Sequence, residues 1–226
     1  GADGIGELAA NAEYNNSPYI EGVIFKEEQF QWVKLPQLRT MDYIIGHWDI
    51  AYAGNATSDY NAVVVQGIKE RKFYVIDTFC RQTKMRAALE WMCQFQKHLP
   101  AGIVVHWQYE AQFWNDEVQR TIREVEKETG VTLNLTKRTL DRTRKIDRIM
   151  SMQPYYQNGR VFYNENLKGS VDMQTGTGQL KSIEPQYKTH DDWPDAHQIC
   201  TTDLEAYMPN NSFKVLMGKM KTFNRW

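Results

Sequence analysis

Three apolar segments that follow one another closely constrain the fold of this chain more than any other feature. Residues 43–52 (YIIGHWDIAY), 60–68 (YNAVVVQGI) and 73–80 (FYVIDTFC) are rich in Val, Ile and aromatic side chains, a composition typical of β-strands. Only the short polar segments AGNATSD and KERK separate them. Because turns this short join antiparallel neighbours, the sequence predicts an antiparallel meander.

After residue 80 the hydrophobic period becomes helical. Residues 83–99 carry Met85, Leu89, Met92 and Phe95 on one helical stripe. RVFYN (160–164) is compatible with a short strand, whereas 164–190, with three glycines, looks irregular. The other predicted elements are a strand over 102–110, a helix over 111–130 ending at Gly130, a strand over 131–136, a helix over 141–159 interrupted near Pro154, and a helix over 191–208. This order of elements indicates the α/β class.

Acidic residues occupy unusual places in this order. Asp49 lies inside an apolar strand, where an unpaired charge is costly. Glu110 ends the fourth predicted strand (102–110), and HDDWPD (190–195) opens the last helix. Carboxylates repel one another unless a cation lies among them. Mg²⁺ and Mn²⁺ take carboxylate oxygens, so the acids predict a site for divalent metal ions.

Each acid also has a structural explanation. Asp49 is compatible with a buried, hydrogen-bonded aspartate, and Glu110 with a carboxylate at a helix N-terminus. Asp191 suits a helix cap, and Asp59 and Asp77 suit a turn and a strand edge. The joint placement of three acidic sites favours the metal.

The order of strands and acids resembles the ribonuclease-H-like nucleases. DWPDA (192–196) resembles the DxxDA signature of Holliday-junction resolvases in that superfamily. NAEYNNSPYIEGVIF (11–25), DIAYAGNATSDYNAVVV (49–65) and HDDWPDA (190–196) are similar to segments of phage terminase large subunits. The resemblance implies a mixed five-stranded sheet, three antiparallel strands then two parallel, flanked by helices. There the first and fourth strands are neighbours and the last helix crosses their ends.

Carried over by position, the resemblance implies that Asp49, Glu110, Asp192 and Asp195 are catalytic and bind two Mg²⁺ or Mn²⁺ ions. Asp191 and His190 are candidates for contacting these ligands rather than the metal. His106 and His190 are also candidate acid–base groups, although a structural, hydrogen-bonded histidine is the commoner role for each. Trp48, Trp107, Trp114 and Trp193 are expected in the core, with Trp193 a candidate for lining the site.

A basic run, KRTLDRTRKIDR (137–148), follows the last predicted strand. It holds six basic residues against two aspartates, which favours contact with a phosphate backbone without base reading. The candidate DNA-binding residues are Lys137, Arg138, Arg142, Arg144, Lys145 and Arg148. The alternative, a solvated helix face with pairs around Asp147, stays open.

The resemblance also divides the chain. It implies a connector from a missing ATPase domain over 1–40, a nuclease domain over 41–208 and a tail over 209–226. The chain contains no GxxxxGK[ST] loop for nucleotide hydrolysis. Its three cysteines are widely spaced, which fits a reducing compartment. No run of residues has the length of a membrane span.

The sequence thus predicts the nuclease domain of a phage or prophage terminase, an endonuclease that cuts concatemeric double-stranded DNA during genome packaging. The implied partners are DNA, an ATPase domain of the same protein, the portal and the small terminase subunit, in the host cytoplasm at the procapsid. Two alternatives remain: a resolvase- or transposase-type nuclease of the same fold, and a catalytically silent DNA-binding or portal-docking module.

Overall fold

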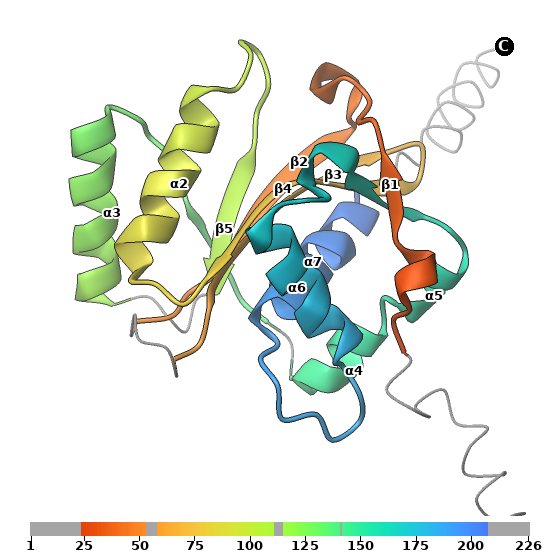
Figure 1. The fold of residues 1–226 in the computed structure, drawn as a ribbon. Helices are drawn as coiled ribbons and strands as arrows, with labels where there is room; N and C mark the ends of the chain where they lie inside the picture. Colours follow the sequence, from red (N-terminus) through yellow and green to blue (C-terminus); the bar gives the residue numbers. More distant parts are fainter. Residues whose placement is uncertain (1–23, 53–57, 111–114, 141, 208–226) are drawn as a thin grey trace, which may run out of the picture.

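A seven-stranded mixed sheet forms the centre of the molecule (Figure 1). The computed structural model describes residues 24–52, 58–110, 115–140 and 142–207. In spatial order the sheet runs β1-β7-β4-β3-β2-β5-β6. The strands are β1 (Gln31–Val33), β2 (Tyr43–Asp49), β3 (Asn61–Lys69), β4 (Lys72–Arg81), β5 (His106–Glu110), β6 (Thr136–Arg138) and β7 (Val161–Asn164).

The predicted meander is confirmed. Strands β2, β3 and β4 pair antiparallel in sequence order. Glu70 and Arg71 form the tight turn between β3 and β4, with φ values of 51° and 66°. Two left-handed residues in succession give the backbone twist that suits a two-residue hairpin.

The predicted number of five strands is wrong. Strand β7 pairs parallel with β4, and β1 pairs parallel with β7, so two more strands extend the meander. The short strand expected at 160–164 is confirmed as β7. Strand β1 has only three residues, and its partner lies about 130 residues later in the chain. No local period could reveal such a strand.

The strand predicted over 131–136 is also misplaced. Pairing with β5 begins at Thr136 and continues to Arg138. Asn134, with a φ of 55°, turns the backbone just before this pairing. The apolar residues Leu133 and Leu135 pack under α3 rather than extending a ladder. As predicted, β5 and β6 are parallel.

Helices cover both faces of the sheet (Figure 1). Helices α2 and α3 lie on one face, and α4, α6 and α7 on the other. The helices are α2 (Met85–Lys97), α3 (Asp116–Thr129), α4 (Lys145–Met150), α5 (Gln153–Gln157), α6 (Val171–Lys181) and α7 (Asp192–Glu205), with short 3-10 helices at Glu27–Gln29, Leu38–Thr40 and Glu165–Leu167. Successive residues of the central strands therefore point into two different hydrophobic cores. Val64 belongs to one core, and Val63 and Val65 belong to the other.

The ends of the predicted helices follow local signals. The Asn115 side chain accepts a hydrogen bond from the backbone N–H of Val118 at 3.0 Å and caps α3. Gly130, with a φ of 70°, ends that helix in the left-handed conformation. The predicted interruption near Pro154 is confirmed, because Pro154 lies in the first turn of α5. Residues 111–114, which were expected to begin α3, lie outside the described residues.

The expectation that 164–190 is irregular is wrong, because α6 occupies Val171–Lys181. Gly176 sits where α6 meets α7, and a Cβ atom there would approach the Trp193 ring to 2.5 Å. The glycine that suggested a loop instead allows two helices to pack closely.

Residues 24–40, predicted as part of a connector, contribute to the fold. Ile24 and Phe25 are buried in the core beneath α5, and 31–33 form β1. The division into connector, nuclease domain and tail stays a prediction, and 1–23 and 209–226 lie outside the described residues. In the part of the chain that the structure describes, no helix has the length and apolarity that crossing a bilayer requires.

Candidate metal centre

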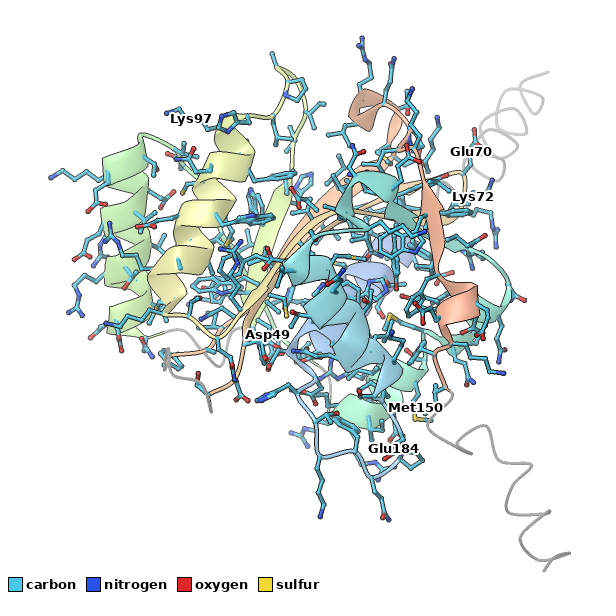
Figure 2. The ribbon with its side chains drawn as sticks, viewed as in Figure 1. Asp49, Glu70, Lys72, Lys97, Met150 and Glu184 are labelled. Carbon is cyan, nitrogen blue, oxygen red and sulfur yellow. The ribbon has the colours of Figure 1, made fainter. Side chains whose placement is uncertain are left out.

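Asp49 and Glu110 end two neighbouring parallel strands. The register pairs Trp48 of β2 with Tyr109 of β5, so the next residues, Asp49 and Glu110, leave the sheet side by side. Asp49 is labelled at the lower end of the sheet in Figure 2. Both residues are buried, with exposed fractions of 7% and 3%.

The first turn of α7 supplies two further buried carboxylates, Asp192 and Asp195. Three residues apart on a helix, they face the same side. Asp192 Oδ2 accepts a hydrogen bond from the backbone N–H of Tyr60 at 2.9 Å, which ties the start of α7 to the start of β3. Asp49, Glu110, Asp192 and Asp195 are called the acid cluster below.

The carboxylates of the acid cluster are close enough to affect one another. The pKa of Asp49 is raised well above its usual range, first by burial and then by the charges of Asp195 and Asp192. Glu110 contributes in the same direction. The pKa of Asp192 is raised to about 6 by burial, although the hydrogen bond from Tyr60 opposes the shift. Four acids drawn from β2, β5 and α7 therefore share one region.

Two carboxylate oxygens of the cluster are buried but lack hydrogen bonds. Within the described part of the chain, Asp49 Oδ2 and Asp195 Oδ2 have no hydrogen-bond partner. A structural aspartate in a core is normally satisfied, because an unmade bond leaves the full desolvation cost. Mg²⁺ and Mn²⁺ prefer hard oxygen ligands, and these two buried carboxylate oxygens have no hydrogen bond to compete with such an ion. The residues present therefore fit a divalent cation.

Helix α4 brings two cations to Asp195. Arg148 Nη1 lies 2.8 Å from Asp195 Oδ1 and donates to Gln198 Oε1 at 2.9 Å. Lys145 Nζ lies 3.4 Å from Asp195 Oδ2 and 3.3 Å from Asp191 Oδ1. Both cations were expected either as DNA contacts or as part of a solvated helix face. Their sequence distance from α7 hid this pairing, since no local pattern connects residues about 47 positions apart.

The Asp191 side chain does not cap α7, although a capping role was one interpretation of its position before the helix. Within the described residues its carboxylate makes no capping bond to α7. It accepts hydrogen bonds from Lys145 and from the Tyr187 hydroxyl instead. Asp191 therefore lies beside the acid cluster and contacts one of its cations.

His190 lies between two aspartates at the edge of the cluster. Its Nδ1 is 3.4 Å from Asp59 Oδ1 and 3.8 Å from Asp192 Oδ2. One ligand atom from each of the three lies within 4.8 Å of the others, close enough to share a metal ion. Asp59, expected to serve only a turn, thus joins the surroundings of Asp192. The feature of the sequence that pointed to Asp59 was its position immediately before the strand predicted over 60–68.

The other basic candidates have different surroundings. Arg138 forms a two-pronged pair with Asp203, at 2.6 and 2.7 Å. Arg144 pairs with Asp147 three residues away, as the solvated-face alternative expected. Lys137, Arg142 and Arg144 are exposed. DNA binding by this run stays a prediction.

The remaining candidates, His106 and the tryptophans, have other partners. His106 begins β5, four residues before Glu110, and stacks on Tyr43 with ring centroids 4.1 Å apart. Trp48, Trp107 and Trp193 are buried in the core, as predicted. Trp193 donates to Thr78 Oγ1 at 2.7 Å. Trp114 lies outside the described residues.

Comparisons of sequence find no relative: no protein-family model matches the chain, and no curated protein matches it.

Comparison of structures finds viral terminases. The human cytomegalovirus terminase nuclease domain, soaked with Mn and bound to an inhibitor, matches with a TM-score of 0.56 and 11% identity over 80% of this chain and 95% of that domain. A second structure of that domain matches with a TM-score of 0.55 and 14% identity over 72% and 83%. The large terminase of a thermophilic bacteriophage matches with a TM-score of 0.53 and 11% identity over 81% of this chain. This chain spans 45% of that phage protein. The chain has the fold of the terminase nuclease domains.

Proposed function

We propose that this chain is a divalent-metal-dependent endonuclease domain that cuts concatemeric double-stranded viral DNA during genome packaging. The observation that carries the proposal is the acid cluster, in which elements distant in sequence bring together four buried carboxylates. Asp49 Oδ2 and Asp195 Oδ2, which have no hydrogen bond among the described residues, favour a cation site over structural aspartates. The fold of the terminase nuclease domains supports the same reading.

In this proposal Asp49, Glu110, Asp192 and Asp195 hold two Mg²⁺ or Mn²⁺ ions. Such a pair activates a water molecule and stabilises the leaving oxygen of a phosphodiester. Asp49 and Glu110 supply rigid ligands, because each ends a paired strand. Arg148 orients Asp195 through Oδ1 and leaves Oδ2 without a hydrogen bond among the described residues. Asp191 supports the ligands through its contact with Lys145, and His190 supports them through its contact with Asp192.

Duplex DNA would approach along the exposed basic residues that flank the cluster. Lys137 lies on β6, the strand whose Arg138 pairs in register with Glu110. Arg142 and Arg144 lie just before α4, whose Lys145 and Arg148 reach Asp195. Cations in such a row fit a phosphate backbone.

The larger assembly is also a proposal. Because the large terminase of the thermophilic phage is more than twice as long as the matching region, we infer an ATPase domain in the same full-length protein. Residues 1–40 would connect it to a nuclease domain over 41–208, followed by a tail over 209–226. A phage or prophage packaging motor would add the portal and small terminase subunit as partners, at the procapsid in the bacterial cytoplasm.

A cleavage assay tests the activity. Supercoiled plasmid is incubated with the purified chain in EDTA, Mg²⁺ or Mn²⁺, and nicked and linear products are measured. We expect cleavage only with the divalent ion, and its loss in Glu110→Gln. Asp77→Asn is the matched control, because Asp77 is a half-buried acid of the sheet that lies outside the acid cluster.

Three outcomes would contradict the proposal in different ways. No cleavage by the wild-type chain favours the silent DNA-binding or portal-docking module. Cleavage of four-way junctions but not of linear duplex favours a resolvase-type nuclease. Equal losses in Glu110→Gln and Asp77→Asn would mean that both changes act through folding.

A further inference from the structure

The two cations of α4 hold Asp195 in different ways. Arg148 is nearly buried, with an exposed side-chain fraction of 10%, and its guanidinium bridges Asp195 and Gln198. Lys145 is 41% exposed and lies at the first residue of the helix. A planar guanidinium with two fixed partners suits permanent pairing, whereas an ammonium on a flexible stem exchanges partners readily.

The two oxygens of Asp195 differ accordingly. Oδ1 accepts a hydrogen bond from Arg148 at 2.8 Å. Oδ2 is buried, has no hydrogen-bond partner among the described residues, and faces Lys145 Nζ at 3.4 Å. Asp49 Oδ2 also lacks a hydrogen bond there, and Lys145 is the cation that acts on the Asp49 charge. The Lys145 ammonium thus pairs with Asp195 Oδ2, and its charge also favours the ionised form of Asp49.

We propose that Lys145 is an exchangeable resident cation of the acid cluster, which neutralises Asp195 and Asp49 until a divalent cation binds and then leaves them. The proposal rests on the proposed function only in requiring that a divalent cation binds at the cluster. Asp191 already contacts Lys145 at 3.3 Å, so the ammonium retains one anionic partner when it leaves Asp195. On the exposed side of α4 it then becomes available to a DNA phosphate.

This arrangement has a measurable consequence. If Lys145 and a divalent cation compete for the same carboxylates, removal of the Lys145 charge must tighten ion binding. We expect Lys145→Gln to bind Mn²⁺ about tenfold more tightly than the wild type, since a unit charge a few Å away acts strongly at a partly buried site. Without metal, Lys145→Gln should melt at a lower temperature, because the carboxylates lose a counter-ion.

The experiment measures Mn²⁺ affinity by isothermal titration calorimetry, with electron paramagnetic resonance of free Mn²⁺ as a second readout. Arg144→Gln is the matched control, because it removes the same charge one residue away, from a side chain that pairs with Asp147. Lys145→Arg keeps the charge and should bind Mn²⁺ close to the wild-type affinity. Circular dichroism of each variant checks folding.

Several results would overturn the inference. Mn²⁺ affinity that is equal in Lys145→Gln and Arg144→Gln would show that Lys145 does not compete. Weaker binding in Lys145→Gln would show that the lysine supports the ion instead. If either of these results is found while the wild type binds Mn²⁺ and cleaves DNA, only the inference about Lys145 fails. If it binds no divalent ion, the proposed function fails as well.

Discussion

Helix α7 contributes to two buried polar clusters that differ in charge and in how completely their hydrogen bonds are made. Toward the sheet centre, His197 and its partners form a neutral network in which each contact has a donor and an acceptor. One turn earlier, the acid cluster holds four carboxylates, two of which have an oxygen without a hydrogen bond in the described structure. The comparison separates a polar cluster whose hydrogen bonds are satisfied within the fold from one that we propose binds a divalent cation.

The histidine network can be followed donor by donor. Gln66 Nε2 donates to Thr201, so Gln66 Oε1 is the acceptor for His197 Nδ1 at 2.7 Å. His197 Nε2 then accepts from the Tyr156 hydroxyl at 2.6 Å, and Tyr163 donates to Tyr156 at 2.6 Å. Burial lowers the pKa of His197 to about 3, which keeps the ring neutral as this network requires. The network is therefore complete without any ligand.

The acid cluster, by contrast, is completed only by cations. Burial and mutual repulsion raise the pKa of Asp49, and α4 supplies two charges that offset part of the cost. Buried polar groups left unsatisfied in a native core call for an explanation in function. The difference between the clusters predicts opposite responses to mutation.

The largest expected effect is on cleavage by Asp49→Asn. The change keeps the size of the side chain but removes the charge that binds metal. We expect activity to fall on the order of 10⁴-fold, while the metal-free melting temperature stays equal or rises, because one repelling charge is gone. Plasmid nicking and thermal unfolding in EDTA measure the two effects. Full activity would refute the metal role, and a large loss of stability would make Asp49 a structural residue.

A stability effect should come next, from His197→Ala. The substitution leaves a cavity and strands the Gln66 and Tyr156 groups without partners, which should cost about 3–5 kcal/mol in the free energy of unfolding. Urea unfolding measures this loss of stability. Added Mn²⁺ should stabilise His197→Ala no more than it stabilises the wild type. If His197→Ala were as stable as the wild type, the contrast between the clusters would break down.

Asp77 offers a half-buried acid outside both clusters. Burial raises its pKa to about 6, although the Thr78 backbone N–H donates to it. Because this folded-state pKa lies above the unfolded value, ionised Asp77 destabilises the fold above pH 6, and the penalty disappears as the pH falls toward 4. Asp77→Asn should therefore raise stability by about 1–3 kcal/mol at pH 7.5 and by little at pH 4. Equal differences at both pH values would exclude an electrostatic cause.

The smallest expected effect is that of Arg144→Gln on DNA affinity. If the exposed basic residues meet phosphates, the loss of one charge should weaken binding of any duplex about threefold and reduce the salt slope by about one. Fluorescence anisotropy in EDTA at several salt concentrations measures both. An unchanged slope would leave Arg144 as a solvated partner of Asp147.

Local patterns in the sequence predicted a large part of this molecule. The composition and short turns of 43–80 determine the meander, because neighbouring strands need no distant partner to pair. Asn115 and Gly130 mark the ends of α3 through caps that involve only adjacent backbone. An acid inside an apolar strand, Asp49, indicated a site before any coordinates were known, because burying such a charge needs a compensating cation.

Only the tertiary structure decided what depends on contacts between distant segments. Strand β1 exists because β7 lies beside it, and α6 tolerates Gly176 because Trp193 fills the space where a side chain would project. Lys145 and Arg148 looked like surface charges until α4 was seen to pack against α7. A side chain's charge and size are written in the sequence, but its partner is set by packing, because contacts across some 50 to 130 residues leave no local period in the chain.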